Sequence, residues 1–246
     1  MQIMVTPANI RSTTCQQNDY YYAGALFATH SLYSYNASKK YSFQTELLLG
    51  IRGPASFAEQ TQKGVHKLIN YQEPMGWDNQ LRTQPLVNLR FGFEKNILSI
   101  NNFIEVNGGS QIKVGSFMDL VTFYPMLRIG KMSPYFDGYM DKFGSFTKNG
   151  KQIKTQYYFV VKPSVTFVAY NAMLTGKREE TLETDLLKGQ NTGTSSSIDN
   201  CIADVQFGAV VALGNFALSY LQTGSTTYRK DLYHHNYGNF SLYFRL

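Results

Sequence analysis

The sequence predicts an all-β protein, an antiparallel transmembrane β-barrel of about ten strands that residues 1–246 form as one domain. Aromatic residues make up 15% of the chain, with 18 tyrosines, which is typical of strands and of belts at a membrane interface. Charged residues are only 16%, yet the mean hydropathy is −0.27 and no run approaches the ~18 apolar residues of a spanning helix. Apolar and polar residues alternate instead, as in a barrel wall between lipid and a polar lumen.

The net charge of +6 does not by itself identify a binding partner. No block of Lys and Arg is interleaved with aromatics, so the sequence does not support binding to nucleic acid. A basic balance suits the anionic headgroups of a membrane. Cys15 and Cys201 are far apart and match no metal-site spacing, and whether they pair stays open.

Alternating segments define the expected strands. In residues 41–51 the apolar side chains from Tyr41 to Ile51 oppose Ser42, Gln44 and Glu46, with Leu48 as the exception. A carboxylate in such a strand must face a polar lumen or a partner, because an unpaired buried charge is costly. The expected strands, in order, are residues 1–9, 19–34, 41–51, 87–94, 97–107, 113–129, 155–176, 205–213, 216–220 and 239–246.

The connections divide into two groups. The turns at 35–40, at Lys95-Asn96 and at Gly214-Asn215 are short. With both chain ends periplasmic, the longer connections 10–19, 53–79, 177–200 and 225–235 fall together on the outer side. Only 130–154 is long on the periplasmic side. The pattern alone does not say which strand face meets lipid, since a soluble sandwich also alternates.

The long segment 51–81 does not read as a strand or a tight turn. Gly53-Pro54 ends the preceding strand, and residues 57–69 predict a helix at the barrel rim, with Ser56 as N-cap and Glu59 completing a capping box. Gln62 and His66 are four residues apart and share one face of this helix. Two interpretations are open: a solvated helix capping one barrel end, or a helix that carries a reactive histidine.

The motifs in this region resemble those of the outer-membrane lipid A 3′-O-deacylase family. The resemblance rests on Gly53-Pro54, on the Gln62-x-x-x-His66 spacing and on Pro74 followed by Gly76-Trp77-Asp78-Asn79-Gln80-Leu81. Tyr21-Tyr22-Ala23-Gly24 is similar to the Tyr-Thr-x-Gly strand start of that family. The specific motifs cover residues 19–35 and 50–95, and the barrel pattern is compatible along the whole chain.

The resemblance implies a bacterial outer-membrane enzyme that uses calcium to remove the 3′-linked acyl group of lipid A in lipopolysaccharide. It implies that His66 is the general base that activates water, with Gln62 orienting water or substrate. Asn9 matches one residue of the family's Asn-Asp pair, and Asp19 is the candidate for the other. Tyr22, Lys63 and Lys67 are candidates for binding substrate.

Three departures leave the activity open. Ile10 follows Asn9 where the family has Asp, and Tyr22 stands where it has threonine. The family barrel has twelve strands, and this chain lacks a hairpin with a functional lysine between residues 34 and 41. The alternative hypothesis is therefore a catalytically inactive barrel of the same fold, acting as a subunit of an outer-membrane protein complex. A third hypothesis, a small pore, is disfavoured because side chains fill the interior of small barrels.

Overall fold

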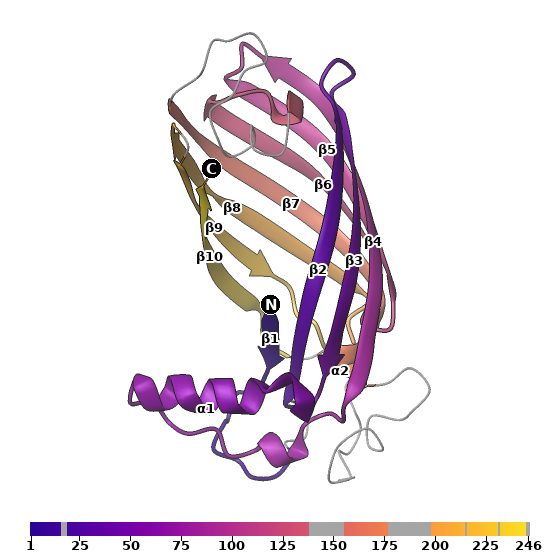
Figure 1. Ribbon diagram of the computed structural model, residues 1–246, viewed down its shortest axis with the longest axis vertical. Coiled ribbons are helices and arrows are strands. Elements are labelled where there is room, and N and C mark those ends of the chain that lie inside the picture. Colours follow the sequence, from indigo (N-terminus) through magenta and orange to yellow (C-terminus); the bar gives the residue numbers. More distant parts are fainter. Residues whose placement is uncertain (16–18, 138–154, 177–197, 215, 231, 245–246) are drawn as a thin grey trace.

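Ten antiparallel strands form one curled sheet in the computed structural model, in the order β1 to β10 (Figure 1). The structure describes residues 1–15, 19–137, 155–176, 198–214, 216–230 and 232–244. The strands are β1 (Gln2–Val5), β2 (Ala23–Asn36), β3 (Tyr41–Arg52), β4 (Gln84–Ile100), β5 (Ile104–Gly115), β6 (Met118–Lys131), β7 (Thr155–Asn171), β8 (Cys201–Leu213), β9 (Phe216–Ser225) and β10 (His235–Phe244). The helices are α1 (Ala58–Leu68), α2 (Ala172–Thr175) and the 3-10 turns η1 (Pro54–Ser56), η2 (Trp77–Asn79) and η3 (Tyr135–Asp137).

The two faces of the sheet differ in chemistry, and the apolar face points outward. Leu49, Phe123 and Phe159 are exposed on the outside, whereas Asn107, Thr122 and Gln156 are buried inside. A soluble sandwich shows the opposite arrangement, with apolar side chains in its core. The outer surface therefore fits lipid, and the alternation of the sequence is confirmed, with Leu48 packed in an inner apolar cluster.

One end of the barrel carries α1 and most of the long connections. Residues 6–15, 19–22, 53–83, 226–230 and 232–234 lie at this end, which is the lower end in Figure 1. The turns at 37–40 and 101–103 lie at the other end. Outer-membrane barrels have short periplasmic turns and longer outer loops, so the α1 end is the outer end. Of the predicted connections 130–154 and 177–200, residues 138–154 and 177–197 lie outside the described residues.

The predicted hairpin at Lys95-Asn96 is wrong. Strand β4 continues through both residues to Ile100, with a register shift against β5 between Asn96 and Leu98. The chain turns instead at Asn101 and Asn102, whose φ angles of 50° and 52° are in the left-handed region that asparagine tolerates. A second turn, at 116–117, separates β5 from β6, where the sequence predicted one strand over 113–129.

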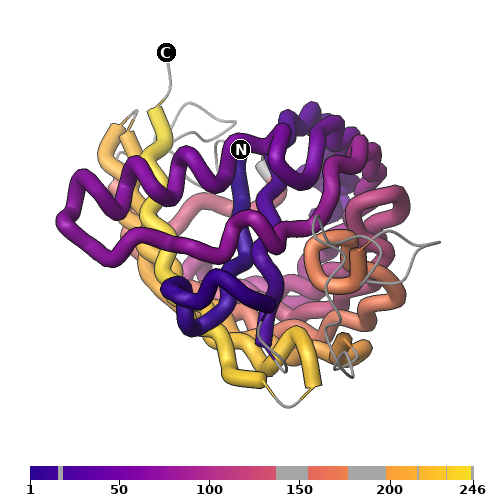
Figure 2. Tube along the Cα trace, turned by 90° about the horizontal axis from the view of Figure 1, so that it is seen from below, coloured from indigo at the N-terminus to yellow at the C-terminus, as the bar shows by residue number. Residues whose placement is uncertain are grey.

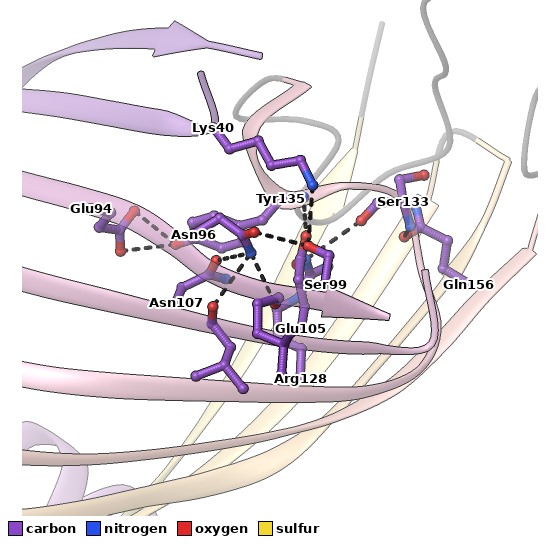
Figure 3. Close-up of polar contacts among 12 residues, drawn as sticks. Lys40, Glu94, Asn96, Ser99, Glu105, Asn107, Arg128, Ser133, Tyr135 and Gln156 are labelled. Atoms are coloured by element: carbon purple, nitrogen blue, oxygen red, sulfur yellow. Dashed lines mark hydrogen bonds and ion pairs between the residues drawn. The ribbon is translucent and has the colours of Figure 1, made fainter. Parts of the chain in front are cut away.

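Polar side chains fill the lumen near the end opposite α1 (Figure 3). The Glu105 carboxylate pairs with the Arg128 guanidinium, and both are buried. The Tyr135 hydroxyl donates to Glu94 at 2.9 Å, and Gln156 accepts from the backbone N–H of Ser133 at 2.7 Å. These contacts anchor the segment that follows β6 inside the barrel, so this part of the lumen is packed with side chains and does not fit an open pore.

In the part of the chain that the structure describes, no helix is both long and apolar enough to cross a membrane. Cys15 and Cys201 do not form a disulfide in the structure, so the open question of their pairing is answered against it.

Candidate functional site

The rim helix α1 begins differently from the sequence prediction, although the expected range 57–69 matches its position. Ser56 is not its N-cap, because Ser56 ends the short turn η1 and its hydroxyl donates to the carbonyl of Gly53 at 2.6 Å. Phe57 takes the N-cap position in a left-handed conformation with φ 57°, and Glu59 pairs with Lys63 instead of closing a capping box. The 3-10 turn therefore replaces the predicted cap.

The first turn of α1 is packed tightly against the barrel wall. Ala58 is buried with Tyr22 and Trp77 in a small apolar cluster. A Cβ added to Gly24 of β2 would lie 2.2 Å from the Cβ of Ala58, so only glycine allows this approach. The contact fixes where α1 leaves the barrel. Figure 2 shows that α1 and the returning segment after it then run alongside each other across the rim.

Gln62 is oriented by the returning segment. Its Oε1 accepts a hydrogen bond from the indole nitrogen of Trp77 at 2.8 Å. Since an indole N–H only donates, the contacting atom of Gln62 is its oxygen, and the amide nitrogen remains as a donor. Gln62 thus presents a donor one helical turn before His66.

His66 is held in one tautomer. Its Nδ1 is hydrogen-bonded to the carbonyl oxygen of Gln72, and its ring packs edge-on against Tyr71 with centroids 5.1 Å apart. A carbonyl oxygen only accepts, so Nδ1 carries the proton and Nε2 of the neutral ring has a free lone pair. That is the tautomer a general base needs, and the side chain is only half-buried.

A hollow of about 700 Å³ opens beside the last turns of α1, lined by Lys63, Gly64, Lys67, Asn70, Tyr71 and Glu73. The ammonium group of Lys63 lies 2.8 Å from Glu59 and 3.9 Å from Glu73. The hydrogen bond that Lys63 donates to Glu59 raises the pKa of Lys63, which keeps this side chain cationic. Tyr71 connects the hollow to His66, because its ring both lines the hollow and packs on the imidazole.

Asn9 and Asp19 lie in the loop between β1 and β2, where both organise the backbone. The carboxylate of Asp19 accepts from the N–H groups of Ala8 at 2.9 Å and Tyr20 at 2.6 Å. The side-chain oxygen of Asn9 accepts from the N–H of Arg11 at 3.2 Å. The loop joins the inserted segment through a hydrogen bond from the N–H of Met75 to the carbonyl of Ile10, at 2.8 Å.

Tyr22 is buried, with only 3% of it exposed. Its hydroxyl donates to the carbonyl of Ile10 at 3.1 Å, and its ring lies 4.8 Å from that of Trp77. Burial raises the pKa of Tyr22, so it remains a protonated donor. The cavity beside it is about 10 Å³, room for roughly one water. These contacts give Tyr22 a supporting position under the rim helix.

No cluster of acidic side chains marks a calcium site among the described residues. Calcium takes six to eight oxygen ligands, usually including several carboxylates. Among the residues that the structure describes, no three His, Cys, Asp or Glu side chains gather where they could hold a metal ion. Each carboxylate oxygen of Asp19 accepts one backbone N–H.

The sequence predicted that one helix carries Gln62, His66, Lys63 and Lys67, and the structure places all four on α1. It missed Trp77 and Tyr71 as the side chains that orient Gln62 and His66. One signal was present, since Trp77 is the only tryptophan of the chain and stands in a polar segment.

Comparisons with known proteins agree with the fold and the motifs. The family model described as outer membrane protein LpxR matches residues 1–246. The solved structure of LpxR from Salmonella typhimurium superposes with a TM-score of 0.81 at 16% identity, covering 100% of this chain and 81% of that chain. No curated protein sequence matches. The structural similarity supports the barrel fold, and the family model covers the whole chain. The chain therefore belongs to the LpxR family of outer membrane proteins, the lipid A deacylase family that its motifs resemble.

Proposed function

We propose that this outer-membrane barrel hydrolyses the 3′-linked acyl ester of lipid A, with His66 as the general base. The observation that carries the proposal is the hydrogen bond between Nδ1 of His66 and the carbonyl of Gln72. It leaves Nε2 to take a proton from water as the water attacks the ester carbonyl. Positioned general bases contribute about 10²–10⁴-fold to a rate.

Gln62 is the candidate for stabilising the oxyanion. When water adds to an ester carbonyl, negative charge develops on the carbonyl oxygen, and preorganised donors aimed at that oxygen lower the barrier. The bond from Trp77 occupies the side-chain oxygen of Gln62 and leaves its NH₂ group to donate. Gln62 and His66 lie one turn apart on α1, so one helix face can contact both the attacking water and the ester carbonyl.

The hollow beside α1 suits the sugar and phosphate part of lipid A. Its lining includes the cations Lys63 and Lys67 and the polar Asn70. Lys67 is exposed, and among the described residues it makes no ion pair, so it is the better placed of the two lysines for an anionic group. The carboxylates of Glu59 and Glu73 partly neutralise Lys63.

Calcium enters the proposal only through the family resemblance. The roles proposed for His66 and Gln62 do not depend on the ion.

The test compares purified wild-type chain, His66→Ala and His234→Ala on lipid A in mixed micelles, with released fatty acid measured by mass spectrometry. His234 is an exposed histidine in the rim connection 226–234, outside α1, and is the matched control. His66→Ala should lower the rate by about 10²–10⁴-fold. His234→Ala should keep the wild-type rate. Full activity in His66→Ala would remove His66 from the mechanism.

A second candidate, the inactive barrel acting as a subunit of a protein assembly, is favoured by the seam of the sheet. Within the described residues, β10 pairs only with β9, and β1 pairs with β2 only from Ala23 to Leu26. Unpaired strand edges in lipid are costly and can accept another strand. Co-purification of a stable partner in mild detergent, together with unchanged lipid A, would support this function over hydrolysis.

A further inference from the structure

The end of α1 exposes a cluster of large apolar side chains. Val65, Leu68 and Ile69 are 49%, 84% and 62% exposed. Isolated exposed apolar residues are common on proteins, but three neighbours on one helix end form a patch that needs an explanation.

This patch continues the face by which α1 is anchored to the barrel. Ala58, in the first turn, is buried against Gly24 of β2. At about 100° per residue, Val65 and Ile69 point within roughly 20° of the direction of Ala58. The same face is thus buried at the start of the helix and exposed at its end. Figures 1 and 2 show the reason, because α1 extends sideways past the barrel edge near β10.

The opposite face of α1 is polar. Gln60, Lys63 and Lys67 lie roughly 140–160° around the helix from Val65. Lys67 and Gln60 are exposed. An apolar face backed by lysines is the pattern of a helix that lies in the plane of a membrane interface.

The barrel places α1 next to a membrane. Its outer wall exposes apolar side chains such as Phe207 and Leu242, and α1 leaves the wall at the outer end. We propose that α1 lies in the outer-leaflet interface, with Val65, Leu68 and Ile69 among the acyl chains and the lysine face toward the anionic headgroups. A soluble protein partner would not explain why the apolar face points the same way as the helix face that rests on the barrel.

This placement gives the catalytic proposal a geometric basis, and in this respect it rests on the proposed function. His66 lies about 100° around α1 from both Val65 and Lys67, on the boundary between the apolar and cationic faces. In a lipid, the acyl ester lies at the same boundary between hydrocarbon and headgroup. The depth of α1 would therefore set the height at which Nε2 of His66 meets the ester.

The test measures the depth of two labelled positions. Cys15 and Cys201 are replaced by Ser, and an environment-sensitive fluorophore is attached to Ile69→Cys or to Gln60→Cys, which lie about half a turn apart on the helix. The full chain is reconstituted in vesicles of phosphatidylethanolamine, phosphatidylglycerol and lipid A. Quenchers carried on the acyl chains then report burial in hydrocarbon. Val65→Cys is the second variant if Ile69→Cys does not fold.

Several-fold stronger quenching at position 69 than at position 60, with a blue-shifted emission, is the expected result. Equal quenching at the two positions, or stronger quenching at position 60, would overturn the inference. The measurement needs no turnover. A wild-type chain that leaves lipid A intact would therefore contradict the proposed function without touching the depth result.

Discussion

The indole nitrogen of Trp77 donates a hydrogen bond to Oε1 of Gln62 at 2.8 Å, and this bond ties the returning segment to α1 one turn before His66. Trp77 is itself buried against Tyr22 and Ala58. The orientation of Gln62 thus depends on the packing of the helix on the barrel.

Replacing Trp77 with Phe keeps an aromatic ring and removes the donor. If Gln62 acts on the reaction, Trp77→Phe should lower kcat by between about tenfold and 10²-fold, because a misplaced group loses most of its effect, and should leave KM nearly unchanged. Initial rates of lipid A deacylation measure both constants. The double variant Trp77→Phe/Gln62→Ala should lose no more than Gln62→Ala alone. Additive losses would mean that Trp77 acts independently of Gln62.

The contact between Gly24 and Ala58 can be tested with two glycines. Gly24→Ala would place a methyl group 2.2 Å from the Cβ of Ala58 and should push α1 off the barrel, lowering deacylation and exposing the rim segment to protease. Gly64→Ala adds a methyl group with nothing within 4 Å and should stabilise α1 by up to about 1 kcal/mol. Equal protease sensitivity of the two variants would show that this contact does not hold α1.

The buried pair of Glu105 and Arg128 should dominate the stability of the lumen. Glu105→Gln leaves the Arg128 charge uncompensated and should lower the free energy of unfolding by about 3–5 kcal/mol. The matched control is Glu46→Gln, since Glu46 is 3.9 Å from Arg90 and less buried, with an expected loss of about 1 kcal/mol. Denaturant unfolding in detergent micelles gives both values. Similar losses would contradict a special role for the buried pair.

Tyr22 was predicted to bind substrate, and its burial indicates support of the rim instead. Tyr22→Phe removes the hydroxyl that donates to the carbonyl of Ile10 and should cost about 1 kcal/mol of stability. KM for lipid A should stay at the wild-type value. A raised KM with unchanged stability would instead support direct contact between Tyr22 and lipid A.

Calcium dependence is the prediction that the family resemblance makes and the described donor set does not support. Deacylation is measured with added calcium and with EGTA, on the same protein and lipid. The family resemblance predicts that the rate falls in EGTA and returns with added calcium, and an equal rate in both would contradict calcium dependence. Loss of activity in EGTA, restored by calcium, would show that ligands from the substrate or from outside the described residues complete a site.

Much of the barrel could be predicted because strand alternation is a local property. The segment from Tyr41 to Ile51 shows it directly, and its outward and inward faces are as the sequence indicated. The orientation of those faces, toward lipid or toward a soluble core, needed the burial of Asn107 and Gln156. The predicted turn at Lys95-Asn96 was wrong, because strand β4 continues through this polar pair with a register shift. The chain turns at Asn101 and Asn102, which adopt the left-handed backbone conformation.

The candidate site was predictable where helical spacing decides neighbours, as for Gln62 and His66. It was not predictable where the chain folds back on itself. The carbonyl of Gln72 sets the tautomer of His66, and the indole of Trp77 orients Gln62, and both depend on the path of the returning segment. The start of α1 was missed for a similar reason, since the left-handed Phe57 has no signature in sequence.

The most direct test of the central claim is mass spectrometry of lipid A from cells that produce the wild-type chain, His66→Ala or no chain, grown with calcium present. The account predicts that wild-type cells lose the mass of the 3′-linked acyl group and that the other two spectra are alike. Unchanged lipid A in wild-type cells, with the barrel shown to be folded in the outer membrane, would contradict hydrolysis and favour the assembly subunit.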